Sequence, residues 1–238
     1  MQLRPRNGRL RVPVALAPLA WATLSRAWRA TSLPARQLQL VEGQLATWRT
    51  GSSIREFDSI SEFIKFTKPH SDRILEVGCS SGYYSQVIKH MRPSMRYVGI
   101  DYSFDFCELG RTRFESNGLV CGNALQLPFR DRDFPIVMSG SVLLHIRDWK
   151  AALVETLRLS SEYVILHRTP VLDARTRTVT KKAYGQRMVE WAFQETDLVE
   201  ECMADGFSLV HTIDLASRQE LSRDAHAPNT RSYLLLRA

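Results

Sequence analysis

A glycine-containing turn and a carboxylate that follows it are the groups in this 238-residue chain best suited to binding a ligand. Gly78 and Gly82 enclose three small residues, 79–81. Because glycine has no side chain, the backbone N–H groups of such a turn can approach a ligand closely. Asp101 lies 23 residues after Gly78, close to the spacing at which nucleotide-binding βαβ units hold a carboxylate against ribose hydroxyls. The glycine pattern is not that of NAD-binding proteins, which argues against NAD as the ligand.

The apolar pattern predicts alternating strands and helices that place these residues at the ends of strands. Residues 73–77 are expected to form the strand before the turn, and a helix over 83–91 follows it, capped by Ser80 or Ser81. The other expected strands are 95–100, 119–122, 135–139, 163–167, 207–213 and 233–236. The other expected helices are 36–48, 59–66, 103–113, one that begins after 148, and 195–205. Open parallel sheets bind ligands beyond the carboxyl ends of their strands.

Three motifs in this order resemble those of class I S-adenosylmethionine-dependent methyltransferases. The first motif of that family is acidic-x-Gly-x-Gly-x-Gly, and in this chain it reads Glu76, Gly78, Ser80 and Gly82. The second motif, V-G-I-D, ends on Asp101, and the third is C-G-N-A-L-Q-L-P-F-R-D-R-D-F. Two residues depart from the family pattern, because Ser80 replaces the middle glycine and Asn123 stands where Asp is usual.

The resemblance implies an α/β fold, a Rossmann-like seven-stranded, mostly parallel sheet with helices on both faces, plus an N-terminal helical arm. It divides the chain into a basic arm over residues 1–55 and a class I methyltransferase domain over 56–238. The implied cofactor is S-adenosyl-L-methionine. Its expected binding residues are Glu76, Gly78, Ser80, Gly82, Asp101, Tyr102, Asn123, Ala124 and Ser139. Asn123 can still bond an adenine edge through its NH₂ group or its carbonyl oxygen.

Two histidines at expected strand ends are candidate catalytic bases for methyl transfer to a hydroxyl. His145 follows the strand 135–139, and His167 closes the strand 163–167. Since these strands are neighbours in the implied fold, both imidazoles are expected to face one cleft. The alternatives are that His145 only forms a wall of the cofactor pocket and that His167 is a packed residue at a strand end.

The segment after His167 is expected to contact the acceptor. An alternating run over 177–181 and turn-like residues at 183–185 predict a hairpin or a lid. The candidate substrate-binding residues of this segment are Arg168, Lys181 and Tyr184. The alternative is that the basic residues of the segment form a solvated face.

Sequence patterns that are absent from the chain limit the expected class of methyl acceptor. Methyltransferases of amide and nucleobase nitrogens usually carry Asn/Asp-Pro-Pro-Tyr/Phe after the fourth strand, where residues 139–142 read S-G-S-V. Oxygen, carbon and simple amine acceptors remain. His, Asp and Glu do not cluster at metal-binding spacing, so no metal is expected. The body of the chain lacks interleaved basic and aromatic residues, which argues against a nucleic-acid substrate.

The net charge of +7 comes from the first fifty residues, which hold eight arginines and one acid, Glu42. Trp21, Trp28 and Trp48 also lie there. We expect this arm to pack on its own domain or on a second subunit of a homodimer. Peripheral contact of residues 1–50 with a membrane surface and a targeting segment are the alternatives. The four cysteines have no C-x-x-C spacing, which favours a reducing compartment, and a cytoplasmic protein is expected.

These features predict an S-adenosylmethionine-dependent methyltransferase for a small-molecule acceptor. The stretches H-R-T-P and K-x-A-Y-G are similar to those of methyltransferases of bacterial surface-sugar biosynthesis, so the preferred acceptor is a hydroxyl of a sugar or glycan precursor. A natural-product or lipid-linked acceptor is the alternative. A non-catalytic binding protein on the same fold is another, which the departures at Ser80 and Asn123 permit.

Overall fold

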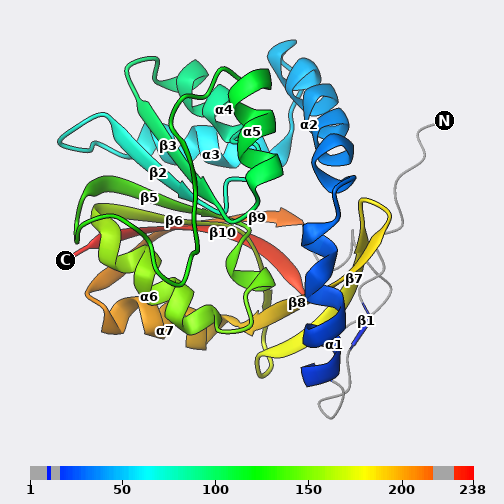
Figure 1. The fold of residues 1–238 in the computed structure, drawn as a ribbon. Helices are drawn as coiled ribbons and strands as arrows, with labels where there is room; N and C mark the ends of the chain where they lie inside the picture. Colours follow the sequence, from blue (N-terminus) through cyan, green and yellow to red (C-terminus); the bar gives the residue numbers. More distant parts are fainter. Residues whose placement is uncertain (1–9, 12–16, 217–227) are drawn as a thin grey trace.

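The computed structural model describes residues 10–11, 17–216 and 228–238, and in it a central sheet is covered by helices on both faces (Figure 1). The helices are α1 (Ala17–Leu24), α2 (Leu33–Arg49), α3 (Arg55–Phe66), α4 (Tyr84–Met91), α5 (Phe104–Arg113), α6 (Trp149–Leu159) and α7 (Glu195–Ala204). Two short 3₁₀ segments are η2 (Ser25–Arg29) and η3 (Leu143–His145). The strands are β1 (Leu10–Arg11), β2 (Arg73–Val77), β3 (Arg96–Asp101), β4 (Leu119–Cys121), β5 (Phe134–Gly140), β6 (Ser160–Leu172), β7 (Arg177–Ala183), β8 (Gln186–Gln194), β9 (Phe207–Ala216) and β10 (Asn229–Arg237).

Seven of the described strands form a core sheet in the order β4-β3-β2-β5-β6-β10-β9. The first five run parallel, whereas β10 is antiparallel to both β6 and β9. Parallel neighbours need crossover connections, which α4, α5 and α6 supply. The expected Rossmann-like, mostly parallel sheet is confirmed, and the carboxyl ends of β2, β3, β4 and β5 meet along one edge.

A hairpin extends the sheet beyond the seven strands that the sequence predicts. β7 and β8 pair antiparallel, and β8 joins the end of β6 through two parallel residue pairs. The two-residue turn Tyr184-Gly185 has φ values of +51° and +77°, as the type I′ turn of short hairpins requires. β1 pairs with β7, so the described sheet has ten strands. The expected hairpin is confirmed, and the expected strand number is too small.

The central strands are apolar along their length because helices cover both faces of the sheet. The last four residues of β2 and the first six of β5 are all buried, a pattern typical of parallel sheets. One core cluster, around Trp149 and Leu198, joins the sheet to α6 and α7. A second cluster, around Phe63 and Ile88, joins the opposite face to α3 and α4. The parallel edge is therefore held rigidly from both sides.

The residues that cap the N-termini of the helices agree in part with those expected from the sequence. The side chains of Ser103 and Asp148 accept backbone N–H groups in the first turns of α5 and α6, at 3.4 and 3.3 Å. The expected capping of α4 by Ser80 or Ser81 is wrong, because α4 begins at Tyr84 and no side chain caps it. The serines belong to the turn before the helix.

α5 packs on the glycine turn at Gly110, where only a hydrogen atom fits. A Cβ at this position would lie 2.3 Å from the backbone oxygen of Ser81 and 2.4 Å from Leu119 Cδ1. We expect Gly110→Ala to lower the free energy of unfolding by about 1–3 kcal/mol, because overpacking pushes the helix and the turn apart.

The matched control is Gly43→Ala in α2, since nothing lies within 4 Å of its added Cβ. This control should raise the free energy of unfolding by about 0.5–1 kcal/mol, because alanine loses less backbone entropy in a helix. Urea unfolding measures both variants, and equal stabilities would contradict the close contact at Gly110.

Candidate functional site

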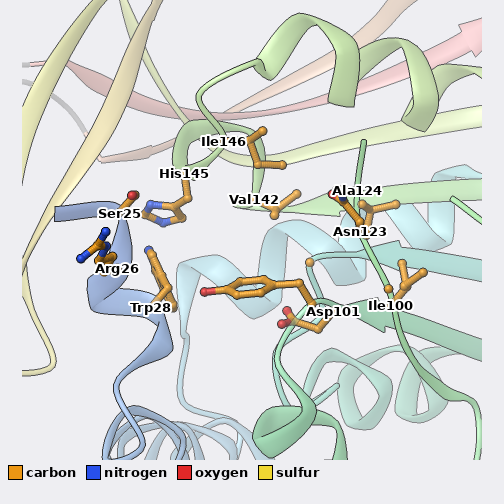
Figure 2. A pocket seen from close by; sticks show the side chains of 14 residues that line it. Ser25, Arg26, Trp28, Ile100, Asp101, Asn123, Ala124, Val142, His145 and Ile146 are labelled. Atoms are coloured by element: carbon orange, nitrogen blue, oxygen red, sulfur yellow. The ribbon is translucent and has the colours of Figure 1, made fainter. Parts of the chain in front are cut away.

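A cavity of about 520 Å³ lies at the carboxyl ends of the central parallel strands (Figure 2). Its wall combines the ends of β2 and β3, the loop after β4, the segment after β5, and η2 from the N-terminal part of the chain. A volume of this size suits a small-molecule ligand. The predicted site residues that line it are Gly78, Asp101, Tyr102, Asn123, Ala124 and His145.

Asp101 ends β3 and is 8% exposed at the cavity wall. Its Oδ2 accepts the N–H of Ser80 at 2.8 Å, and its Oδ1 accepts the N–H of Ser103 at 2.9 Å. Burial raises the pKa of this carboxyl, whereas the two N–H groups act in the opposite direction. The carboxylate therefore holds the glycine turn and keeps further lone pairs for ligand hydroxyls.

Position 78 requires a residue without a side chain. Its φ is +72°, and an added Cβ would lie 2.2 Å from the Cβ of Val142, which also lines the cavity. The Gly78 N–H donates to the backbone oxygen of Ile100 at 2.8 Å, which ties the turn to β3. The cavity thus has a backbone floor at this point, as the sequence predicts.

Asn123 presents its amide on the far side of the cavity from η2 (Figure 2). Its Oδ1 accepts the N–H of Leu125 at 3.0 Å, which fixes the side-chain orientation. The NH₂ group is then left to donate to a ligand, and Oδ1 keeps a second lone pair. Asn123 can therefore bind an adenine edge although Asp is usual at this position.

Four of the expected cofactor-binding residues are not on the cavity lining: Glu76, Ser80, Gly82 and Ser139. Glu76 is 1% exposed, and the hydroxyl of Tyr97 donates to its Oε2 at 2.5 Å. Burial raises the pKa of this carboxyl well above its usual range. Ser80 has a φ of +51° and accepts a hydrogen bond from Gln37 Nε2 at 3.4 Å. These residues shape the turn, and direct cofactor contact stays a prediction for them.

His145 closes η3 with its imidazole packed against Trp28, the ring centroids 4.5 Å apart. Burial lowers its pKa from 6.5 to about 4, so the ring is neutral near pH 7. Its Nδ1 is shielded from solvent and has no hydrogen-bond partner among the described residues. A neutral imidazole with an unused ring nitrogen can accept a proton from a bound hydroxyl.

His167 is not on the cavity lining, and the expectation that it shares one cleft with His145 is wrong. It is 1% exposed, with its Nε2 2.7 Å from the Tyr84 hydroxyl and its Nδ1 2.9 Å from Ser232 Oγ. Burial lowers its pKa well below the usual range. Both ring nitrogens are occupied by protein hydroxyls, so the packed alternative fits this histidine and we do not carry it forward as the base.

The expected substrate-binding residues lie in β6 and the β7–β8 hairpin, outside the cavity lining. Lys181 Nζ lies 3.6 Å from Oε1 of Glu190, a buried carboxylate on the facing strand. The backbone oxygen of Tyr184 accepts a hydrogen bond from Arg36 Nη1 at 2.9 Å. Substrate contact by Lys181, Tyr184 and Arg168 stays a prediction.

The N-terminal segment supplies a wall of the cavity that the sequence did not assign. Arg26 and Trp28 of η2 line the cavity opposite Asn123 (Figure 2). Trp21 of α1 packs on Trp191 of β8, with the ring centroids 5.4 Å apart. This part of the basic arm therefore packs on its own domain. The tryptophans of this segment could have indicated the packing from the sequence, because such large side chains are highly buried on average.

The motifs and the fold recur in known proteins. Residues 75–162 match the family model of the methyltransferase domain. A Schizosaccharomyces pombe protein named as an uncharacterized methyltransferase is 27% identical over 162 residues, which are 60% of this chain and 56% of the relative. A demethylmenaquinone methyltransferase of Thermotoga maritima is 23% identical over 120 residues, 50% of this chain and 52% of the relative. The chain thus spans about half the length of these relatives.

A solved structure matches over the whole length. The 1,6-didemethyltoxoflavin-N1-methyltransferase of Burkholderia thailandensis, with bound 1,6-didemethyltoxoflavin and S-adenosylhomocysteine, has a TM-score of 0.65 at 13% identity, covering 100% of this chain and 98% of that chain. Over residues 75–162 the chain is thus similar to methyltransferase domains, and its fold is that of class I S-adenosylmethionine-dependent methyltransferases. The cavity lies at the carboxyl ends of the parallel strands, with Gly78, Asp101 and Asn123 of the three motifs on its wall.

The described residues were also compared with the features of metal sites and membrane-spanning helices. No group of three or more His, Cys, Asp or Glu side chains within them is arranged to hold a metal ion. Within the same residues no helix combines the length and apolarity needed to cross a membrane. The peripheral membrane contact and the homodimer expected for residues 1–50 stay predictions, and residues 1–9 and 12–16 lie outside the described part.

The two buried histidines predict a loss of stability in mild acid. Their folded-state pKa values are below the unfolded value of 6.5, about 4 for His145 and well below 6.5 for His167. Their contribution is fully present above pH 6.5 and is lost as pH falls toward the folded pKa, because only the unfolded chain takes up the protons. Each proton is worth about 1.4 kcal/mol per pH unit in this window.

We therefore expect His145→Gln to reduce the slope of unfolding free energy against pH between about pH 6 and pH 4.5. Urea unfolding at several pH values measures the slope. A variant whose slope equals that of the wild type would contradict the neutral, buried state of His145.

Proposed function

We propose that this protein transfers a methyl group from S-adenosylmethionine to a small-molecule acceptor. When bound, the cofactor supplies a methyl group activated by its sulfonium. The observation that carries the proposal is the convergence of Gly78, Asp101 and Asn123 on one cavity at the edge of the parallel sheet. A close backbone, a carboxylate for ribose hydroxyls and an amide for an adenine edge are groups that can bind this cofactor.

The residues of the chain that would act on the acceptor lie at the His145 end of the cavity. Positioning is the main task of the protein in methyl transfer, and a hydroxyl acceptor must also lose its proton. We assign proton acceptance to His145, because its ring is neutral and its Nδ1 lacks a partner among the described residues. Since Trp28 packs on this ring, η2 has to shift or share the space when the acceptor binds.

The wall near His145 favours an acceptor with an apolar ring. Trp28, Val142 and Ile146 supply apolar surface, and Ser25 and Arg26 are the polar neighbours that η2 adds to this wall. A sugar would need more hydrogen-bonding groups to replace its hydration. The name of the Thermotoga maritima relative, a demethylmenaquinone methyltransferase, supports the same choice. We therefore place a natural-product or lipid-linked acceptor ahead of the sugar or glycan hydroxyl.

Calorimetric titration tests the cofactor. We expect micromolar binding of S-adenosylmethionine and S-adenosylhomocysteine and no binding of NADH. Absence of binding by the first two would overturn the proposal. Mass-spectrometric screening of phenols and hydroquinones, followed by sugars, then tests the acceptor. Methylation of sugars alone would reject the apolar-ring assignment.

Asp101→Ala should weaken binding of S-adenosylhomocysteine by roughly 1–3 kcal/mol, because a charged hydrogen-bond acceptor is lost. Asp105→Ala is the matched control, since Asp105 is an exposed acid in the first turn of α5 and does not line the cavity. Calorimetry on variants with checked melting temperatures measures the effect. Unchanged affinity in Asp101→Ala would reject the ribose assignment.

His145→Gln should leave cofactor affinity near the wild-type value and slow methyl transfer by about 10²-fold or more, the usual size of a general-base contribution. His70→Gln, at an exposed histidine before β2, serves as the control. Single-turnover rates with an acceptor from the screen provide the measurement. Full activity of His145→Gln would remove this residue as the base and leave it as a wall of the cavity.

A further inference from the structure

Arg168 has a strained backbone inside β6. Its φ is +56°, in the left-handed region that residues with a Cβ avoid. Two hydroxyl groups hold this conformation. The Arg168 N–H donates to Ser232 Oγ at 3.2 Å, and Ser141 Oγ donates to the Arg168 backbone oxygen at 3.3 Å. Strain of this kind persists where the surroundings over-determine the conformation, and it often accompanies a functional site.

A buried chain of hydrogen bonds stands behind this residue. The Tyr84 hydroxyl lies 2.7 Å from His167 Nε2, and His167 Nδ1 lies 2.9 Å from Ser232 Oγ. All three side chains are at most 1% exposed. The chain fixes Ser232, which in turn fixes the Arg168 N–H. His167 thus acts as a positioning residue for Arg168.

The guanidinium of Arg168 lacks a carboxylate partner within the described part of the chain. Tyr83, Tyr84, Tyr184 and Glu56 are its titratable neighbours, and it forms no ion pair with Glu56. Arg168 is partly exposed, and a guanidinium without an anionic partner is available to bind one. The surrounding tyrosines offer hydroxyl groups that can join it in binding an anion.

The backbone of Arg168 is tied to the cavity wall. Its oxygen accepts from the hydroxyl of Ser141, the residue before Val142. The His145 N–H donates to the backbone oxygen of Val142 at 2.9 Å, and Val142 and His145 both line the cavity. Arg168 therefore lies near the His145 end. This is the end at which a methyl donor and its acceptor must meet if the proposed function holds.

We propose that Arg168 is a carboxylate-binding residue of this methyltransferase domain, an inference that rests on the proposed function. The planar guanidinium can bind a carboxylate through two parallel N–H bonds. The carboxylate belongs either to the methionyl part of the cofactor or to the acceptor, and the two sources can be separated by experiment.

The test uses Arg168→Met, which keeps the length of the side chain and removes its charge. Arg175→Met is the matched control, because Arg175 is an exposed arginine in the loop before β7. Calorimetry compares S-adenosylmethionine with decarboxylated S-adenosylmethionine, which lacks only the carboxylate. A second titration adds benzoate to protein saturated with S-adenosylhomocysteine. The melting temperature in benzoate is compared with that in chloride at equal ionic strength.

Two results support the inference. If the cofactor supplies the carboxylate, Arg168→Met loses about tenfold or more in affinity for S-adenosylmethionine, as expected for a charged pair, and keeps its affinity for the decarboxylated form. If the acceptor supplies it, both nucleosides bind as in the wild type, and the stabilisation by benzoate disappears in the variant. Arg168→Lys should restore part of either effect, because it restores the charge without the planar geometry.

Two other results overturn it. Equal losses for both nucleosides would mean that Arg168 only supports the fold, and unchanged nucleoside and benzoate responses would mean that it binds no carboxylate. If Arg168→Met does not fold, the same measurements are made on Arg168→Lys. The ratio of its two nucleoside affinities and its benzoate response then decide between the same outcomes. If the wild type binds neither nucleoside, the proposed function fails, and the benzoate response, measured on the free protein, still tests Arg168.

Discussion

The bond from the Asp101 carboxylate to the backbone of the glycine turn is the contact on which the site depends. Left-handed backbone at Gly78, Ser80 and Gly82 makes the turn, and such a conformation needs support from its neighbours. Asp101 provides it through the Ser80 N–H, and the backbone oxygen of Ile100 provides it through the N–H groups of Gly78 and Cys79. Both supports come from the end of β3. The floor of the cavity is therefore anchored to the sheet.

Burial favours neutral groups throughout this region. It raises the pKa values of Glu76 and Asp101 and lowers those of His145 and His167. Charges that persist there act with little screening, because the surrounding medium polarises less than water. Asp101 lies on the cavity wall, and Arg168, which we propose as a carboxylate-binding residue, carries the opposite charge. A ligand that carries both a cationic centre and an anionic group would match such a field.

Local features of the site could be predicted from the sequence. The turn at Gly78 and the position of Asp101 follow from short stretches whose chemistry has few structural solutions. The hairpin was predictable for the same reason, since strand-like alternation surrounds Tyr184-Gly185, and only a turn with positive φ joins strands so closely.

Contacts between distant parts of the chain could not be predicted. His167 was misassigned because its partners, Tyr84 and Ser232, lie far from it in the sequence. A strand-end histidine looks the same in sequence whether its nitrogens face a cavity or two hydroxyl groups. The packing of Trp28 on His145 and of Trp21 on Trp191 was missed for the same reason. Ser80 or Ser81 was expected to cap a helix, but α4 begins only at Tyr84 and no side chain caps it.

The packing of Trp21 on Trp191 also sets an order of assembly during synthesis. Trp21 leaves the ribosome early, whereas β8 is made only when most of the chain has emerged. Until then the apolar surface of α1 has no docking strand and η2 cannot close the cavity wall. The parallel core from β2 to β6 can be made before that wall is completed. The lining of the cavity thus comes from the first two thirds of the chain, whereas the strand that supports its η2 wall comes from the last third.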